Sequence, residues 1–424
     1  MKHALIGAVL AMVVASSNAM AAGSEIEALK AQMKTMMERI EQLEKAEAAT
    51  NRASQSAHQS SKQEIERRAT TSEPRQEKAK SSVSTTKAAN SSNPAISVVG
   101  TFTGQRIRGS GGVQSSSFLP LSEAEFIFGA NIDPHARLDV TVTGANGGMA
   151  VEEGYITAYL PLGVNLKAGR KFLPIGRVNG VHPHSLIYGD RPNGLVNLFG
   201  PEIFVGDGLL IDRPFFIGDS AQTVTAGLFS TTNDVAFDPT GANQYAGLAR
   251  WTGVWDSSDF STLELGATYV QGKNGIAAAS GSQTRLMAGH LAWKYADLEQ
   301  LSLGVEGEWI HSRQEQGLNV APLNSDGSYL LADLGINRNW HLFSRFDYSR
   351  QRDPVTQMMA IEKGLSAGVV RKLSEFQSLT FQYKHTRGAL ANVAADMGIA
   401  PGGRANAWYF RWVVAIGPHG AHAY

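Results

Sequence analysis

A histidine-proline-histidine triplet, His182-Pro183-His184, is the feature of this chain whose residue types and spacing most directly suggest chemistry. Imidazole is a common zinc ligand, the proline stiffens the backbone between the two rings, and Asp190 could be a third ligand. The alternative is local hydrogen bonding in a loop, because two histidines without a defined third partner are weak evidence for a metal site. We expect no cofactor unless His182 and His184 hold zinc.

Other reactive patterns do not stand out in the sequence. No Ser-His-acid set or pair of carboxylates is recognisable, so we do not expect an enzyme. The chain has no cysteine, which excludes disulfides and thiolate metal sites. Its formal net charge is zero and 18% of its residues are charged, so bulk electrostatics gives no reason to expect nucleic-acid binding.

The two histidines lie in a long segment, residues 173–205, which we call the third loop because it is the third long connection between predicted strands. It reads LPIGRVNGVHPHSLIYGDRPNGLVNLFGPEIFV. An irregular connection of this length is unusual and tends to be functional. Much of it is apolar, so we expect it to pack against the rest of the protein instead of extending into water.

The segments around the third loop have the pattern of β-strands. From Ala95 onward, short alternating stretches are separated by Gly, Asp, Asn and Pro; in one of them Leu303 and Trp309 alternate with Glu306 and Glu308. This pattern predicts about sixteen strands, at residues 95–108, 119–130, 137–143, 151–160, 165–172, 206–217, 221–231, 244–255, 260–271, 284–295, 300–313, 328–337, 341–350, 362–372, 378–387 and 406–417.

The length of each connection depends on whether it follows an odd-numbered or an even-numbered predicted strand. Those after odd-numbered strands are long: 109–118, 144–150, 173–205, 232–243, 272–283, 314–327, 351–361 and 388–405. Those after even-numbered strands are short turns such as PLGV and GDS. This asymmetry and an even strand number are typical of an all-β transmembrane antiparallel barrel. The third loop would enter the barrel mouth and form a pore constriction with Arg177, His182, His184, Asp190 and Arg191.

The charged member of each alternation should face an aqueous lumen, because an Arg or Lys facing lipid at mid-bilayer costs about 2–4 kcal/mol. We assign to the lumen wall Glu123, Glu125, Lys167, Lys171, Arg250, Glu306, Glu308, Arg345, Lys384 and Arg411, together with Arg137, Asp139, Glu264, Lys294 and Asp347. Acidic and basic residues are nearly balanced in this set, so the wall alone predicts no strong ion selectivity.

Three segments precede the predicted barrel, which we place at residues 94–424. Residues 1–21 have a positive start, an apolar run and an A-x-A ending, which predict a secretory signal peptide. Residues 22–46 predict a short coiled-coil helix, since apolar residues are spaced 3 and 4 apart. This predicted trimer seam consists of Ile26, Leu29, Met33, Met36, Ile40 and Leu43. Residues 47–93 are rich in Ser, Ala, Lys, Gln, Glu and Thr and predict a polar spacer.

The C-terminal segment AWYFRWVVAIG predicts the strand that closes the barrel, with Trp408, Phe410 and Trp412 facing outward. The ending GPHGAHAY contains His419 and His422 and finishes on Tyr424. We interpret this tail as an assembly or packing element, with zinc binding by the two histidines as the alternative.

Four stretches, in this order, resemble a family of proteobacterial outer-membrane porin-like proteins with an N-terminal coiled coil: NPAISVVGTFTG, SEAEFIFGANIDPHARLDVTV, VEEGYITAYLPLGVNLKAGRKFLPIGRVNGVHPHS and GPHGAHAY. Members are described by analogy as phosphate-selective-porin-like or zinc-regulated outer-membrane proteins. The resemblance covers most of residues 93–424 and implies a β-barrel in the outer membrane, but no particular solute. An energised receptor is a poor match, because it needs a plug inside a barrel of about 22 strands and residues 24–93 cannot form one.

We therefore expect an outer-membrane porin, a passive channel for small hydrophilic solutes or ions, with the coiled coil in the periplasm. One alternative is a zinc-uptake pore that uses His182, His184, His419 and His422. Another is a structural tether that joins the outer membrane to the cell wall through the coiled coil. The expected partners are outer-membrane lipid, lipopolysaccharide, the barrel assembly machinery acting on the C-terminal strand, and further copies of the chain in a homotrimer.

Overall fold

The computed structural model describes residues 94–109, 112–145, 148–231, 233, 235–237, 245–276, 281–297, 301–353 and 355–417. The predicted signal peptide, coiled coil with its trimer seam, and polar spacer lie outside these residues, as do His419, His422 and Tyr424. The chain divides into two units, Met1–Thr86 and Lys87–Tyr424, and all described residues belong to the second.

The described residues form one antiparallel sheet of β1 (Ala95–Gly109), β2 (Gly112–Ser117), β3 (Leu121–Asp133), β4 (Ala136–Ala145), β5 (Gly148–Leu160), β6 (Val164–Phe172), β7 (Val205–Ile217), β8 (Ser220–Thr231), β9 (Tyr245–Ser258), β10 (Ser261–Lys273), β11 (Gln283–Ala296), β12 (Ser302–Gln314), β13 (Leu323–Asn337), β14 (Trp340–Arg352), β15 (Met359–Ser374), β16 (Gln377–Arg387) and β17 (Arg404–Ile416). All sixteen predicted strands are present.

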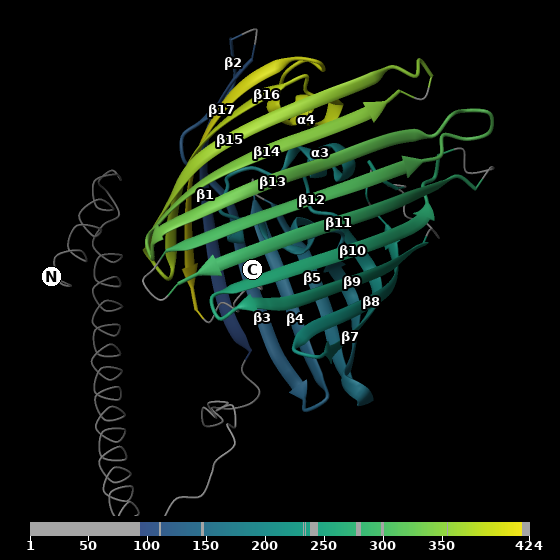
Figure 1. Ribbon diagram of the computed structural model, residues 1–424, viewed down its shortest axis with the longest axis vertical. Coiled ribbons are helices and arrows are strands. Elements are labelled where there is room, and N and C mark those ends of the chain that lie inside the picture. Colours follow the sequence, from purple (N-terminus) through teal and green to yellow (C-terminus); the bar gives the residue numbers. More distant parts are fainter. Residues whose placement is uncertain are drawn as a thin grey trace, which may run out of the picture. The chain divides into compact units, whose positions relative to one another are not determined.

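The sheet closes on itself, because β1 pairs with β17 on one side and with β3 on the other (Figure 1). β2 pairs with the far end of β1, where Gln105 faces Ser117, and β3 continues along the same strand from Phe102. β2 and β3 therefore share one position in the ring, and the seventeen strands make a closed sixteen-strand barrel. The predicted fold class is confirmed for the barrel.

The connections at one end of the barrel are short turns of two to five residues: 134–135, 161–163, 218–219, 259–260, 297–301, 338–339 and 375–376. The predicted long connections at 109–118 and 144–150 are wrong, since β2 and the first residues of β5 occupy most of them. In both places the paired strands extend past the residues that alternate regularly between apolar and polar. The alternation therefore predicted strands that are shorter than the observed ones.

The outer face of the barrel carries the apolar members of each alternation. In β16, the Phe381 side chain is 49% exposed, whereas its inward-facing neighbours Thr380 and Gln382 are buried. Part of the interior is apolar as well, because Leu248, Leu286 and other inward side chains join one buried cluster with the third loop. The barrel is therefore apolar outside and partly filled inside.

The third loop, residues 173–204 in the structure, contains the short helices η2 (Val178–Gly180), η3 (Pro183–Ser185) and α3 (Asn193–Phe199). Every residue of α3 is buried, and α3 contacts β13, β14 and α4 (Ala391–Met397) of the β16–β17 connection (Figure 1). Gly194 permits this approach, since a Cβ there would lie 2.8 Å from the Ser328 nitrogen. One further short helix, η1 (Pro161–Gly163), forms a turn. Within the described ranges no helix has the length and apolarity needed to cross a bilayer.

Candidate functional site: the third loop inside the barrel

The third loop crosses the interior of the ring. It contacts Glu153 of β5 through His182 and Glu308 of β12 through the backbone N–H groups of Arg177 and Val178. Six strands, β6 to β11, separate β5 from β12 on one side of the ring, and eight positions separate them on the other. The two walls therefore face each other, and the loop lies between them.

Asn179 closes the base of this loop. Its side-chain amide donates to the carbonyl oxygens of Leu173 and Phe204, each at 2.9 Å, and its Oδ1 accepts from the Phe204 N–H at 3.1 Å. The same oxygen accepts from Arg191 at 2.5 Å. Burial lowers the pKa of Arg191 to about 10. Asn179 is fully buried and joins the first residue of the loop to the last.

Arg177 fixes the loop to β10 and β12. Its guanidinium donates to Glu264 at 2.9 Å and to Glu306 at 3.0 Å. Glycine is required beside it, because Gly176 has a φ of +64° and a Cβ there would clash with the Glu308 carboxylate. Arg250 adds hydrogen bonds to the carbonyl oxygens of the loop at this point. The positive charge of Arg177 is therefore compensated by carboxylates of the barrel wall.

Asp190 fixes the loop to β14 and β16, in what we call the aspartate anchor. Its carboxylate accepts from Arg345 at 2.8 Å, from Lys384 at 2.5 Å and from Gln382 at 2.6 Å. Arg345 is fully buried and also pairs with Asp347 at 3.1 Å. Burial alone would raise the pKa of Asp190, but Arg345 and Lys384 outweigh it and hold that pKa well below its usual range.

His182 and His184 fix the loop to β3 and β5, in what we call the histidine anchor. Glu125 Oε1 lies 2.9 Å from His184 Nδ1, and Glu125 Oε2 lies 3.2 Å from His182 Nδ1. On its other side, His182 Nε2 lies 3.2 Å from Glu153 Oε2. Burial would lower the pKa of His182, but the carboxylates of Glu125 and Glu153 raise it to about 10.

A β-bulge gives the histidine anchor an additional carboxylate. The β4–β5 register shifts so that Thr141 faces Glu153 and Val142 faces Val151, which leaves Glu152 as the extra residue. Adjacent residues of a regular strand point to opposite faces, whereas a bulge can re-aim a side chain. Glu152 thereby lies 3.8 Å from His182, on the same side of the wall as Glu153.

The constriction residues predicted from the sequence all lie in this loop, but they do not form one group. Asp190, named from the sequence as a possible third metal ligand, does not lie with His182 and His184: it pairs with Arg345 and Lys384, and Glu125 lies beside the histidines. Eight predicted wall residues contact the loop: Glu125, Arg250, Glu264, Glu306, Glu308, Arg345, Lys384 and Arg411.

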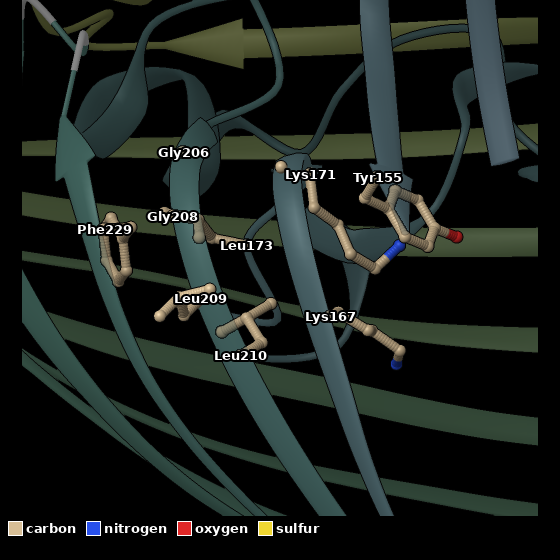
Figure 2. A pocket seen from close by; sticks show the side chains of 10 residues that line it. Tyr155, Lys167, Lys171, Leu173, Gly206, Gly208, Leu209, Leu210 and Phe229 are labelled. Carbon is tan, nitrogen blue, oxygen red and sulfur yellow. The ribbon is translucent and has the colours of Figure 1, made fainter. Parts of the chain in front are cut away.

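Two other predicted wall residues, Lys167 and Lys171, pair with carboxylates of the barrel strands. Lys167 pairs with Asp212 at 2.5 Å, and Lys171 pairs with Glu153 at 3.0 Å. Figure 2 shows Lys171 extending to the ring of Tyr155, 4.1 Å from its centroid. The adjoining cavity of about 10 Å³ has room for about one water molecule.

A larger cavity of about 190 Å³ lies between the third loop and strands β3, β5 and β17. Its lining carries the carboxylates of Glu123, Glu152, Asp190 and Glu202, and the guanidinium groups of Arg191 and Arg411. Arg411 donates to the carbonyl oxygens of Pro183 and Leu186, so part of its hydrogen-bonding capacity is used to hold the loop.

Sequence reasoning did not single out Glu152, Glu153, Asn179 or Gln382. Two adjacent glutamates break the alternation expected for a strand, and that break is the one signal that could have indicated the bulge. Asn179 and Gln382 gave no signal, since their roles depend on contacts with residues distant in sequence.

The comparisons with known proteins support the barrel. No family model matches the chain. An uncharacterized protein of Aquifex aeolicus (strain VF5) is 28% identical over 224 residues, which cover 46% of this chain and 45% of the relative, so the match spans less than half of either protein.

Among solved structures, an anion-selective porin from Comamonas acidovorans has a TM-score of 0.51 at 12% identity and covers 76% of this chain and 100% of its own. The outer membrane channel DcaP of Acinetobacter baumannii has a TM-score of 0.51 at 6% identity and covers 77% and 99%. A loop-deletion mutant of OmpT, an outer membrane protein of Vibrio cholerae, has a TM-score of 0.51 at 11% identity and covers 76% and 99%. At these identities the likeness shows the fold: a porin-type barrel.

Proposed function

We propose that this protein is an outer-membrane porin, a passive diffusion channel for small hydrophilic solutes or ions, in which the third loop narrows the lumen. The observation that carries the proposal is a closed sixteen-strand ring whose longest described connection turns inward and binds both facing walls. A barrel of this size encloses an aqueous channel in porins. A connection held across the interior is then the element that sets the width of the channel.

The outer surface supports a place in a membrane. Large apolar side chains are exposed on the outer face of many strands, including Leu209, Leu228, Leu330 and Phe381. Each is 49% to 56% exposed, which a water-soluble protein would have reason to bury. Outer-membrane barrels have an outward-facing band of apolar residues, with short turns at one end of the barrel and longer loops at the other.

We further propose that the passage beside the third loop prefers cations. The sequence predicted that Arg177 and Arg191 lie in the pore constriction. In the structure Arg177 pairs with Glu264 and Glu306, and the half-buried Arg191 donates to Asn179. The cavity between the loop and β3, β5 and β17 is instead lined by four carboxylates and the guanidinium groups of Arg191 and Arg411. Asp190 pairs with Arg345 and Lys384, whereas Glu123, Glu152 and Glu202 form no salt bridge with Arg or Lys in the described part of the chain and outnumber the two guanidinium groups. Unmatched carboxylates favour cations.

The zinc-uptake alternative is not favoured by a structural observation. His182 is 6% exposed and His184 is 8% exposed, so both rings are held inside the loop-to-wall contact and do not line an open path. The tether and the homotrimer rest on residues 22–93, outside the described ranges. The homotrimer remains our expectation, to be tested by crosslinking chains with and without residues 24–46.

The proposed function is tested by fractionation followed by reconstitution. The mature protein should fractionate with the outer membrane and migrate differently on gels with and without boiling, because a closed barrel resists detergent. In planar bilayers it should give ohmic single-channel steps, and salt gradients should give reversal potentials on the cation side. Recovery as a folded soluble periplasmic monomer, or bilayers that never conduct, would contradict the proposal.

A further inference from the structure

The histidine anchor has the donor atoms and spacing of a metal site. Glu125, His182 and His184 each offer one ligand atom, and the three atoms lie within 4.8 Å of one another. An ion held by bonds of about 2.0–2.1 Å in tetrahedral geometry places its ligand atoms about 3.3 Å apart. The Glu125 oxygens lie 2.9 Å and 3.2 Å from the two Nδ1 atoms, so small side-chain rotations would admit an ion.

A fourth ligand is available on the bulge of β5. Carboxylate oxygens of Glu123, Glu125 and Glu152 also lie within 4.8 Å of one another, and Glu125 belongs to both groups. Glu152 lies 3.8 Å from His182 Nδ1 and reaches the cluster because of the bulge. Two imidazoles and two carboxylates make a closed set suited to zinc.

The charge around this cluster is unbalanced in favour of a cation. Glu123, Glu125, Glu152 and Glu153 converge here, and Lys171 is the one Lys or Arg in the described part of the chain that forms an ion pair with any of them. Glu125 is 1% exposed, and its Oε2 forms no well-aligned hydrogen bond within the described residues, although His182 Nδ1 lies 3.2 Å away. A buried carboxylate oxygen is costly unless a positive charge lies beside it, and either a proton on His182 or a bound cation can supply that charge.

The surroundings also orient the ligands. His182 Nε2, the ring nitrogen away from Glu125, lies 3.2 Å from Glu153. Metal-bound histidines usually pass their second N–H to such a carboxylate, which fixes the ring and makes it a better ligand. Glu153 is itself held by Lys171 and by the Phe172 N–H at 2.9 Å.

We propose that Glu125, His182 and His184, with Glu152 as fourth ligand, bind one divalent cation of the Zn²⁺ type, and that this ion fastens the third loop to β3 and β5. The site joins one segment of the loop to two separate strands, so an ion there crosslinks the constriction to the wall. Binding itself needs no open channel and stands apart from the proposed function. The effect of the ion on conductance rests on that function.

The test uses the full-length mature protein, purified in detergent and treated with EDTA. Zn²⁺ is titrated by calorimetry, and bound metal is counted after gel filtration. The parent should bind one ion per chain. Glu125→Gln, and His182→Ala combined with His184→Ala, should each weaken binding by more than about 100-fold, while Glu153→Gln, which perturbs only the orienting carboxylate, should weaken it about 10- to 100-fold.

The matched control is His311→Ala, which removes a histidine paired with Asp326 at 3.0 Å elsewhere in the barrel and should leave zinc binding unchanged. If the double histidine variant does not fold, the nearly isosteric Glu125→Gln supplies the same test. A parent that binds no zinc would overturn the site. Undiminished binding in Glu125→Gln and in the double histidine variant would also overturn it and would direct attention to His419 and His422.

A conductance measurement separates this proposal from the porin proposal. If the channel conducts, Zn²⁺ should alter its conductance in the parent and not in Glu125→Gln. A channel that conducts but binds no zinc overturns the metal site alone. A protein that binds one zinc at this site but never conducts overturns the porin function and leaves the site in place.

Discussion

The aspartate anchor and the histidine anchor hold the same loop by opposite chemistry. At the aspartate anchor, the loop supplies one acid and the wall supplies Arg345 and Lys384, with Asp347 as a second acid, so that two positive charges meet two negative ones. At the histidine anchor, the loop supplies two imidazoles, and the wall supplies four carboxylates with Lys171. One anchor is matched in charge, and the other is rich in negative charge.

The difference indicates what each anchor can do. A matched, buried ion-pair network has no place for an additional ion, and removing one member leaves an uncompensated charge. A carboxylate-rich cluster with imidazoles is stabilised by a proton on His182 or by a metal ion. The aspartate anchor is therefore a permanent attachment of the loop, whereas the histidine anchor can respond to its surroundings.

The largest effect is expected from Asp190→Ala. This change leaves Lys384 without an acid partner and the fully buried Arg345 with Asp347 alone, so that one positive charge is uncompensated and the loss should be about 3–5 kcal/mol of stability. The thermal midpoint of the barrel in detergent measures this loss. The control Asp207→Ala breaks an exposed pair with Arg170 and should cost less than about 1 kcal/mol. Similar losses in the two variants would contradict a special role for the aspartate anchor.

The two anchors should weaken at opposite ends of the pH range. The pKa of Asp190 is below its unfolded value, so its contribution is present above about pH 4 and is lost as the pH falls further. The pKa of His182 is raised from 6.5 to about 10, so in EDTA-treated protein its contribution is complete below pH 6.5 and is lost as the pH rises through 10.

Both pH ranges are tested by recording the thermal midpoint of unfolding as a function of pH. Asp190→Asn should flatten the acid limb and leave the alkaline limb in place, while His182→Gln should do the reverse. Profiles of both variants that run parallel to the parent profile would show that neither group controls the pH dependence.

The smallest effect is expected from Glu125→Gln in EDTA-treated protein. The change loses the charged contacts to His182 and His184, but it also removes repulsion from Glu123 and Glu152. The two effects oppose each other, so the net loss should be about 1 kcal/mol, within the usual range for a hydrogen-bonded pair. A loss of stability equal to that of Asp190→Ala would show that the charges of the histidine anchor are as well matched as those of the aspartate anchor.

The sequence was sufficient for the barrel and insufficient for its interior. Alternation along each strand is a local property, so the strands could be predicted, and β16 shows the pattern plainly: Phe381 faces out, and Thr380 and Gln382 face in. In β9, Ala246 and Leu248 also face in, although neighbouring outward residues are apolar too. Alternation disappears where the wall packs against the third loop, and that loss is the mark of an internal core.

The site depended on contacts that no local pattern encodes. Arg345 and Lys384 lie more than 150 residues from Asp190, and the sequence could not indicate that they meet. The bulge that turns Glu152 inward is a register shift between two strands, which becomes visible only when both are paired. The helices α3 and α4 span seven residues each, too short for helical periodicity to be recognised.

Single-channel conductance of a chain lacking residues 180–200 tests the central claim, that the third loop narrows the lumen, most directly. The deletion removes both histidines, Asp190 and all of α3, so it should raise conductance several-fold while the barrel still inserts and keeps its heat-dependent migration. A chain lacking residues 318–321, four exposed residues of the β12–β13 connection, should conduct like the parent. A 180–200 deletion that inserts normally and also conducts like the parent would contradict the account.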